Sequence, residues 1–396
     1  MRCVPFIFSS VSHWSLRATR HYSSNKLEFH VPVMHKEVLA MFQPQTNQKF
    51  LDLTFGAGGH TRKLLNSASN ITVYTLDRDP LAYELAIQLA SKTLYGQVTP
   101  LLGKFSDLPE LLPVSEAYNF FDGILIDCGC SSMQYDTRER GFSLSKNGPL
   151  DMRMDQNRLE NQPSAKDILA NIDEDSLCRI LKVYGEEKQA KKIARAIIEA
   201  RYLFKSLQTT HELAQLIEST CGLSARTDKL QRPSHVATKT FQALRILVND
   251  ELNELDFAVR FAHRALKIGG KLVAITFHSL EDRIVKEHLH ELDCSPGTSE
   301  DIYKTYGRQL NRLVPLPQMK QQQWQSINKH VLVPSVEEVN ENPRSRSAKL
   351  RAAYYTLSID RMNERRYSHQ APENTNIFWQ ALMHTDSSYE KLTSQT

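Results

Sequence analysis

The segment that most limits the possible folds is a short apolar stretch followed by a glycine-rich turn. Residues 49–56 read KFLDLTFG and predict a strand that runs into a turn, and residues 59–66 predict a helix directly after it. Glycines at such a junction let the backbone approach a ligand closely. A strand, a glycine turn and a helix in this order are typical of ligand-binding α/β sheets, so we expect a largely parallel, buried sheet.

Further strands and helices alternate after this turn. Pro80 opens a helix that we expect to run to about Leu94, because proline is favoured at the first helical position. The expected strands cover residues 71–77, 98–105, 121–128, 271–277 and 349–359. Of these, residues 121–128 are the most apolar, as a buried parallel strand should be. The alternation predicts a Rossmann-like, doubly wound sheet.

A helical insert is expected inside this sheet domain. From residue 135 to 232 we find no strand pattern, whereas Ile193 and Ile197 belong to an apolar stripe with helical spacing. Thr209 and Glu212 form a predicted capping box at the start of another helix. The prediction is therefore a discontinuous sheet domain at 27–134 and 233–360, interrupted by an all-α insert at 135–232. Residues 295–329 are expected to be a polar loop, and 361–396 a flexible tail.

Composition excludes several classes of protein. Hydrophobic residues make up 41% and charged residues 24% of the 396 residues, as in ordinary globular chains. Apolar runs such as 121–129 are far shorter than the ~20 residues of a membrane span, so no membrane association is expected. The six cysteines form no C-x-x-C pair, which argues against a disulfide scaffold or a zinc ribbon. We expect no bound metal.

The first 26 residues read as a targeting segment. They contain four basic residues and no acid, and so carry the whole net charge of +4. An Arg- and Ser-rich, acid-free start with interleaved apolar residues is typical of a mitochondrial transit peptide, which predicts a location in the mitochondrial matrix. A secretory signal fits less well, because serines break the apolar stretch. The remaining alternative is a disordered tail without a function.

The glycine turn and two aspartates predict a cofactor site. The dinucleotide fingerprint G-x-G-x-x-G fails here, because its third glycine would fall at Thr61. Instead, Asp52 precedes the turn and Asp77 ends the next strand, where a carboxylate can accept the hydroxyls of a ribose. An acid, the pair Gly56-x-Gly58 and a second acid resemble class I S-adenosylmethionine methyltransferases, in which the glycines of the turn lie against the amino-acid end of the cofactor. The alternative is a purely structural turn with carboxylates that cap helices.

Two more strand ends belong to the same edge of the sheet. Phe105 closes the third predicted strand, where it could stack on an adenine or simply belong to the core. Asp127 ends an otherwise apolar strand, and an unpaired buried charge is costly. Ligands of open α/β sheets bind at the carboxyl ends of the strands, so Asp127 is a candidate site residue.

At this point several passages resemble one family, the RsmH (MraW) methyltransferases of small-subunit ribosomal RNA. They include LDLTFGAGGHTRKLL (51–65), RGFSLSKNGPLDMRMD (140–155), ATKTFQALRILVNDEL (237–252) and TFHSLEDRIVK (276–286). The resemblance covers about residues 29–358 and implies methylation of a cytidine N4. It adds His60 and Gln134 to the expected cofactor contacts Gly58, Gly59, Asp77, Phe105 and Asp127. With the transit peptide, the chain resembles a mitochondrial member.

The chain departs from the family pattern at two places. Residues 127–136 read DCGCSSMQYD, where cysteines replace two apolar residues of the usual family sequence. We expect these cysteines to be tolerated as volume swaps in the core. Asn147 stands where the family usually has an aspartate, which puts any role of a carboxylate at that position in doubt.

The chemistry suggests two catalytic candidates. The lone pair of a cytosine N4 is conjugated into the ring, so the enzyme must accept a hydrogen bond from the amine and hold it near the methyl group. Asp127 is the expected acceptor, unless it acts only by orienting the cofactor. His278, at the end of the predicted strand 271–277, is expected to line the base pocket, although it could equally cap the helix that follows.

The expected macromolecular partner is small-subunit rRNA within an assembling mitochondrial small subunit. The target cytidine must be single-stranded or flipped out of a duplex. Two basic clusters could bind the backbone, unless they are merely solvated faces. One comprises Lys188, Lys191, Lys192 and Arg195, and the other comprises Arg344, Arg346, Lys349 and Arg351. Two rival functions stay open, namely a nicotinamide oxidoreductase and a non-catalytic ribosome assembly factor.

Overall fold

A computed structural model describes residues 31–94, 97–204, 207–222, 226–227, 233–290, 324–328 and 330–356. The expected transit peptide at 1–26 and the expected tail at 361–396 lie outside the described residues. So does most of the predicted polar loop at 295–329. In the described part of the chain, no helix is long and apolar enough to cross a membrane.

The centre of the molecule is a seven-stranded mixed sheet with the order β3-β2-β1-β4-β7-β9-β8. The strands β1 (Lys49–Asp52), β2 (Thr72–Asp77), β3 (Val98–Leu102), β4 (Phe121–Asp127) and β7 (Leu266–Thr276) pair in parallel. β9 (Lys349–Tyr355) and β8 (Trp324–Ser326) complete one edge with antiparallel pairing. The strand order reverses between β1 and β4, which is where ligands bind in open α/β sheets. The predicted doubly wound sheet is confirmed.

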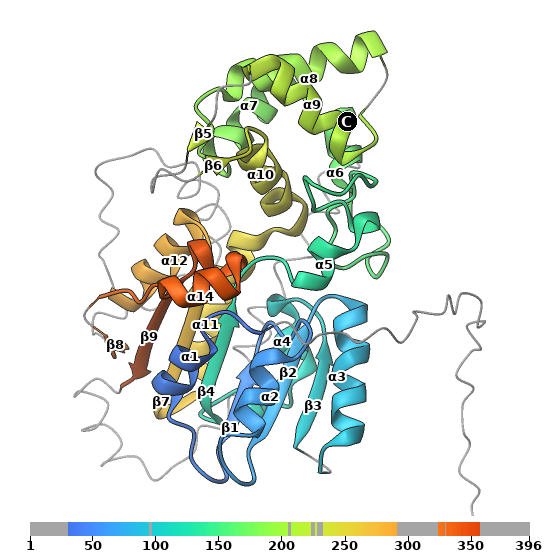
Figure 1. Cartoon of the computed structure of the whole chain (residues 1–396). Coiled ribbons are helices and arrows are strands. Elements are labelled where there is room, and N and C mark those ends of the chain that lie inside the picture. Colours follow the sequence, from blue (N-terminus) through green and yellow to red (C-terminus); the bar gives the residue numbers. More distant parts are fainter. Residues whose placement is uncertain are drawn as a thin grey trace, which may run out of the picture.

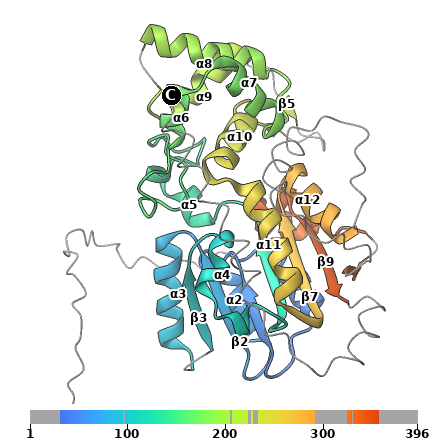
Figure 2. The same cartoon turned by 180° about the vertical axis from the view of Figure 1, so that it is seen from behind.

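Helices cover both faces of this sheet (Figures 1 and 2). One face packs against α11 (Glu251–Ala265) and α12 (Ser279–His290), and the other against α1 (His35–Phe42) and α2 (Gly59–Leu65). The stretch of β4 from Gly123 to Ile126 is apolar because both of its faces are buried. Ile124 and Ile126 belong to the first core, whereas Leu125 between them belongs to the second. Because neighbouring side chains point to opposite faces, a strand buried on both sides must be apolar at every position.

Smaller elements complete the sheet domain. The helix α3 (Pro80–Lys92) flanks the β3 edge, and its first turn is capped by the side chain of Asp79. α14 (Val336–Glu341) lies on the other side, before β9. Short turns occupy the connections: α4 (Leu108–Leu111), η1 (Phe105–Asp107), η2 (Val114–Glu116) and η4 (Pro343–Ser347).

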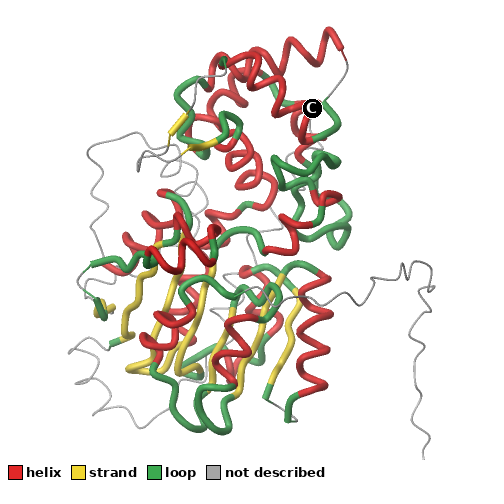
Figure 3. Tube along the Cα trace, viewed as in Figure 1, coloured by secondary structure: helices red, strands yellow, loops and turns green. Residues whose placement is uncertain are grey.

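A second, mostly helical region lies beyond the carboxyl ends of the strands, where Figure 3 shows red helices and green loops above the yellow strands of the sheet. Its helices are α6 (Ala165–Asn171), α7 (Glu174–Val183), α8 (Ala190–Phe204), α9 (Thr210–Cys221) and α10 (Thr238–Asn249). They enclose a core of their own, which includes Ile193 and Ile197 of the predicted apolar stripe. Phe241 and Leu244 of α10 belong to this core too. α5 (Ser132–Asp136) and η3 (Arg138–Arg140) connect the two regions.

The structure confirms the predicted capping box at the start of α9. The Thr209 hydroxyl accepts the Glu212 N–H at 3.3 Å, and the Glu212 carboxylate accepts the Thr209 N–H at 3.1 Å. These reciprocal bonds satisfy two backbone donors that the first turn of a helix leaves unpaired.

Three local expectations are wrong. Residues 135–232 are not free of strand, because β5 (Arg226–Thr227) pairs antiparallel with β6 (Pro233–Ser234). β8 lies inside the segment expected to be a loop, where the buried Trp324 ring packs 6.0 Å from the Tyr355 ring. β3 ends at Leu102, so Phe105 opens η1 instead of closing the strand. Strands of two or three residues are too short to show an alternating pattern, and they form through contacts distant in sequence.

Candidate functional site

A cavity of about 750 Å³ lies at the carboxyl ends of the parallel strands. Its lining comes from the glycine turn, from the ends of β2, β4 and β7, and from the helical region. The volume falls in the range of about 300–1,000 Å³ that is usual for small-molecule sites. The site therefore lies between the sheet and the helical region, where residues of both can contact one ligand.

The glycine turn forms one wall of this cavity. Gly56 and Gly59 line it, and Gly56 has a left-handed backbone with φ +55°. Gly58, with φ +76°, is the N-cap of α2 and is not among the described residues that line the cavity. A Cβ on Gly58 would lie 2.6 Å from the Phe55 ring. Gly58 therefore shapes the turn without lining the cavity, while Gly56, the first glycine of the Gly-x-Gly pair, lines it.

Asp52 stabilises the same turn from below. Its buried carboxylate accepts the Thr61 hydroxyl at 2.6 Å and the Thr54 N–H at 3.2 Å. Burial raises the pKa of Asp52, although these hydrogen bonds oppose the shift. Asp52 is not among the described cavity-lining residues, so its role is to hold the start of α2 against β1.

Asp77 ends β2 and lines the cavity. Its Oδ2 accepts the Gly56 N–H at 2.7 Å and its Oδ1 accepts the Asp79 N–H at 2.9 Å. Burial raises the pKa of Asp77 to about 7, although both N–H groups favour the ionised form. Each carboxylate oxygen can accept more than one hydrogen bond, so Asp77 can still take up the hydroxyls of a ribose.

His60 and Asp127 meet at the bottom of the cavity. His60 Nε2 lies 3.6 Å from Asp127 Oδ2, and both residues line the cavity. Asp127 is held in place through its backbone N–H, which donates to the Thr54 hydroxyl at 2.7 Å. His60 Nε2 and Asp127 Oδ1 are buried without a hydrogen-bond partner in the described part of the chain. Buried polar atoms are rarely left unpaired, so these two indicate a polar ligand.

Phe105 and Gln134 also line the cavity. Phe105 is positioned by its neighbour Ser106, whose N–H and hydroxyl both donate to Glu254 of α11, at 2.9 and 2.8 Å. Gln134 is buried and connects two elements. Its Nε2 donates to Asp79 at 3.0 Å, and its Oε1 accepts the Ser131 N–H at 3.1 Å. Gln134 thus holds α5 against the start of α3.

His278 follows β7 and lines the same cavity. His278 was expected either to line the base pocket or to cap the next helix. Both are compatible, because His278 lines the cavity and also caps α12. Its Nδ1 accepts the Glu281 N–H at 3.4 Å, while Glu281 Oε2 accepts the Phe277 N–H at 2.7 Å. His278 Nε2 lies 2.9 Å from Glu281 Oε1 but makes no aligned hydrogen bond among the described residues. His278 therefore lies at the wall of the cavity with Nε2 beside a buried carboxylate.

Sequence reasoning missed a buried charge cluster beside His278. Arg245 Nε and Nη2 each donate to a Glu251 oxygen at 2.8 Å, and Nη2 lies 3.7 Å from Glu281. All three residues line the cavity. Burial would raise the pKa of Glu281, but His278, Arg245 and the Phe277 N–H lower it below its usual value. Nothing in the sequence marked these residues, because α10, α11 and α12 meet only in the folded chain.

The cysteines at the end of β4 are unsuited to nucleophilic chemistry. Cys128 and Cys130 are free and line the cavity. Burial raises the pKa of Cys130 to about 12 and places that of Cys128 well above its usual value. Since the thiolate is the nucleophilic form, neither thiol is activated at neutral pH.

Comparison with known proteins identifies the chain. Residues 28–356 match the MraW methylase family.

The chain belongs to the MraW methylase family.

Similar proteins occur in animals and bacteria. The chain is 47% identical to the mouse 12S rRNA N(4)-cytidine methyltransferase METTL15, covering 84% of this chain and 85% of that protein. It is 43% identical to the ribosomal RNA small subunit methyltransferase H of Rhizobium meliloti, covering 83% and 87%. It is also 52% identical to a putative receptor-type tyrosine-protein phosphatase, mosPTP-1, of Culex quinquefasciatus, but spans 23% of that longer protein.

S-adenosylmethionine is the methyl donor of a MraW methylase, and the residues of the cavity fit it. Asp77 presents a carboxylate where the ribose would lie, and Phe105 offers an aromatic face for an adenine. The backbone of Gly56 lines the cavity between them and Asp127. The unpaired atoms of His60 and Asp127 match the polar amino-acid end of such a cofactor.

Proposed function

We propose that this protein methylates N4 of a cytidine in mitochondrial small-subunit rRNA, with S-adenosylmethionine as the methyl donor. Family membership supports the methyl transfer, and the 12S rRNA N(4)-cytidine methyltransferases among the relatives support the substrate. We further propose that Gly58 acts through the shape of the turn, whereas Gly59, His60, Asp77, Phe105, Asp127 and Gln134 surround the cofactor.

One observation carries the assignment of the reacting centre. Asp127 ends β4 and lines the same cavity as Asp77 and His278, and its Oδ1 is buried without a partner among the described residues. A carboxylate oxygen accepts hydrogen bonds only, and an exocyclic amine donates them. This arrangement supports Asp127 as the group that holds the N4 amine.

Bound S-adenosylmethionine supplies an electrophilic methyl group on a sulfonium. Asp127 accepts a hydrogen bond from the N4 amine, which turns the nitrogen toward the methyl group and stabilises the positive charge that develops on it. His278 lines the same cavity. Because its Nδ1 accepts the Glu281 N–H, Nε2 carries a ring proton, which it can share between Glu281 Oε1, 2.9 Å away, and a carbonyl oxygen or ring nitrogen of the base.

The two basic clusters differ in how many of their charges are available to bind RNA. Lys188, Lys191, Lys192 and Arg195 are all exposed along α8 and its approach, which supports a phosphate-binding face. In the other cluster, Lys349 and Arg351 both pair with Asp282, at 2.9 and 2.7 Å, and so contribute little free charge.

The remaining members of the second cluster lie at the cavity. Arg344 and Arg346 line it, as does Lys146 of the helical region. Asp136 contacts Arg344 at 2.7 Å and Lys146 at 3.4 Å. Basic side chains at the cavity suit contact with the phosphates on either side of a flipped nucleotide.

The proposal also covers the role of the helical region and the location of the protein in the cell. We propose the helical region from residue 135 to 232 as the RNA-recognition insert, with α10 completing its core. We propose residues 1–26 as a transit peptide that directs the protein to the mitochondrial matrix, and an assembling small subunit as its partner. The homology to mitochondrial 12S rRNA methyltransferases supports this location.

Mass spectrometry of nucleosides from mitochondrial small-subunit rRNA tests the proposal most directly. Loss of the protein should remove N4-methylated cytidine, and re-expression of the wild-type chain should restore it. Re-expression of an Asp127→Asn variant should not. If small subunits fail to accumulate while N4 methylation is unchanged, the protein is a non-catalytic assembly factor and the proposal is wrong.

A further inference from the structure

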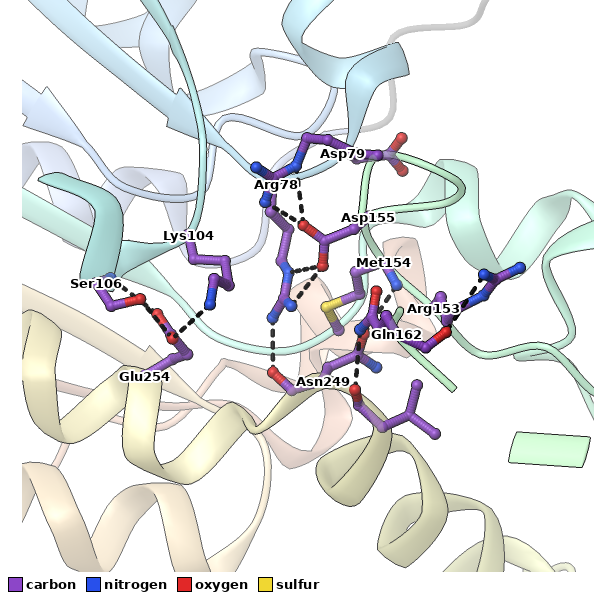
Figure 4. Close-up of polar contacts among 12 residues, drawn as sticks. Arg78, Asp79, Lys104, Ser106, Arg153, Met154, Asp155, Gln162, Asn249 and Glu254 are labelled. Atoms are coloured by element: carbon purple, nitrogen blue, oxygen red, sulfur yellow. Dashed lines mark hydrogen bonds and ion pairs between the residues drawn. The ribbon is translucent and has the colours of Figure 1, made fainter. Parts of the chain in front are cut away.

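The loop after β2 contacts the helical region through Arg78, which also lines the cavity, and through Asp79, which does not. Figure 4 shows Arg78 between Asp155 of the helical region and the end of α10. Its Nε donates to Asp155 Oδ2 at 2.7 Å, and its Nη1 donates to the Asn249 carbonyl at 2.7 Å. Asp155 is fully buried and also contacts Arg158. One guanidinium thus connects the sheet domain to two separate parts of the helical region.

Asn249 extends this connection into the wall of the cavity. Its Oδ1 accepts the Met154 N–H at 2.8 Å, and its Nδ2 donates to the Met152 carbonyl at 2.8 Å. Met152 and Met154 both line the cavity. The contacts made by Arg78 and Asn249 therefore decide where this stretch of cavity wall lies.

The neighbouring Asp79 makes a second set of contacts with the same region. Its carboxylate accepts hydrogen bonds from Gln134 at 3.0 Å, Arg140 at 2.6 Å and Gln156 at 2.9 Å. The loop carries Asp77, Arg78 and Asp79 in succession. Asp77 faces the cofactor side, while Arg78 and Asp79 contact the helical region.

The backbone conformation of segment 150–158 indicates that it needs the contacts from Arg78 and Asp79 to keep its shape. Met152 and Gln156 have left-handed backbones, with φ +63° and +55°. Non-glycine residues adopt this conformation at a cost and keep it when the surrounding contacts enforce it. Without the contacts from Arg78 and Asp79, we expect the segment 150–158 to relax to other conformations.

We infer that Arg78 is a positioning residue that couples cofactor binding to the placement of segment 150–158, which forms the part of the cavity wall on the side of the RNA-recognition insert. A ligand on Asp77 restrains the loop, and the restrained loop holds segment 150–158 through Arg78. Cofactor and RNA then bind with positive cooperativity, and each strengthens the other by the same factor. The inference rests on the proposed function, because it takes RNA as the second ligand.

The coupling is measured on the full chain with S-adenosylhomocysteine, which prevents turnover, and an in vitro transcript of the mitochondrial small-subunit rRNA. RNA affinity is determined with and without saturating S-adenosylhomocysteine. We expect wild type to bind RNA at least about 5-fold more tightly with it, the lower end of common couplings. Arg78→Lys keeps the charge beside Asp155 but loses the fork that spans two acceptors, so the ratio should fall to within about 2-fold of unity.

Arg153→Lys is the matched control. Arg153 makes a forked contact with Asp151 inside the same segment, at 2.8 Å from both Nε and Nη2. Its side-chain contacts in the described chain stay within residues 151–162. The control should therefore keep the wild-type ratio. A merely structural role of Arg78 would weaken both affinities and leave the ratio unchanged, which would overturn the inference.

Hydrogen exchange tests the same coupling without RNA. S-adenosylhomocysteine should slow amide exchange in residues 150–158 of wild type and of Arg153→Lys, but not of Arg78→Lys. Equal protection in all three proteins, or none in wild type, would overturn the inference. Because no RNA is present, protection in this experiment can be observed even if the protein proves not to methylate RNA, so the two proposals fail separately.

Discussion

Asp127 Oδ2 lies 3.6 Å from His60 Nε2, beyond the reach of a good direct hydrogen bond. Asp127 ends β4, and His60 lies in the first turn of α2. The remaining carboxylate oxygen, Oδ1, is buried without a partner among the described residues. His60 Nε2 and Asp127 Oδ1 are therefore available to form hydrogen bonds with a ligand in the cavity.

Asp127→Asn should abolish most methyl transfer while RNA binding persists. The amide can turn an N–H toward the amine, where the reaction needs an acceptor. We expect the rate of transfer to rRNA fragments to fall by about 10²-fold or more. Single-turnover assays measure this loss, and filter binding measures RNA affinity.

Asp122→Asn is the matched control for that variant. Asp122 lies near the start of the same strand, where it pairs with Lys267 at 2.8 Å and does not line the cavity. The rate of methyl transfer by the Asp122→Asn variant should stay close to the rate of the wild-type protein. Equal losses in both variants would mean that the effect comes from the strand and not from the cavity.

Asp77→Ala should weaken S-adenosylmethionine binding by about 1.5–3 kcal/mol, the usual scale for hydrogen bonds to a charged group. Calorimetry measures the affinity directly. Unchanged affinity would remove Asp77 from the ribose site.

Cofactor affinity should also depend on pH through Asp77. Its pKa of about 7 in the folded protein means that the carboxylate ionises as the pH rises through neutrality, so affinity should increase between about pH 6 and pH 8. The raised pKa also predicts that this group lowers stability as the pH rises from about 4, its unfolded pKa, to about 7. A pH profile that is the same in wild type and in Asp77→Ala would contradict this origin.

Gly58→Ala and Gly56→Ala should separate the shape of the turn from cofactor contact. Both positions have left-handed backbones, which cost a side chain about 1–2 kcal/mol. A Cβ at Gly58 also meets the Phe55 ring at 2.6 Å, whereas the nearest atom to a Cβ at Gly56 is 3.6 Å away. Thermal unfolding should show a larger loss for Gly58→Ala. Gly58→Ala with native stability and lost cofactor binding would instead make Gly58 a direct contact.

The exposed lysines of the helical region should carry much of the salt dependence of RNA binding. Lys188, Lys191 and Lys192 are exposed, whereas Arg195 pairs with Glu199 at 2.7 Å and is left in place. Changing the three lysines to Ala should reduce the slope of log affinity against log salt by about 0.7–0.9 per lost phosphate contact. Filter binding over a salt series measures the slope.

A triple variant of the sheet domain provides the comparison. Lys63, Lys92 and Lys286 are exposed lysines outside the helical region. Changing them to Ala alters the net charge by the same amount and should leave the slope near the wild-type value. If both triple variants change the slope equally, the α8 face is a solvated surface and not a specific RNA contact.

Residues 1–26 should direct a fused cytosolic reporter into mitochondria. Their four basic residues and lack of acids suit import driven by the membrane potential. Microscopy with fractionation measures the location, and protease protection after the outer membrane is opened distinguishes the matrix. Replacing the four basic residues with Gln should leave the reporter in the cytosol. A wild-type fusion that stays cytosolic contradicts the matrix location.

The sequence by itself determined the elements whose causes are local. β4 is apolar at successive positions because both of its faces are buried, and Thr209 and Glu212 stand at the spacing that a capping box requires. The glycine turn, with Asp77 at the next strand end, indicated the class of cofactor. Each of these signals lies within a few residues of the chain, so one sequence suffices to find it.

Tertiary structure alone decided which of these residues share a surface. Arg245, Glu251 and Glu281 come from three helices, and Arg78 reaches Asp155 across 77 positions of sequence. Gly58 faces the Phe55 ring and not the cavity, and Trp324 extends the sheet through contacts with residues far along the chain. Such contacts depend on how whole elements pack, and because packing joins residues without regard to their spacing, no local pattern records them.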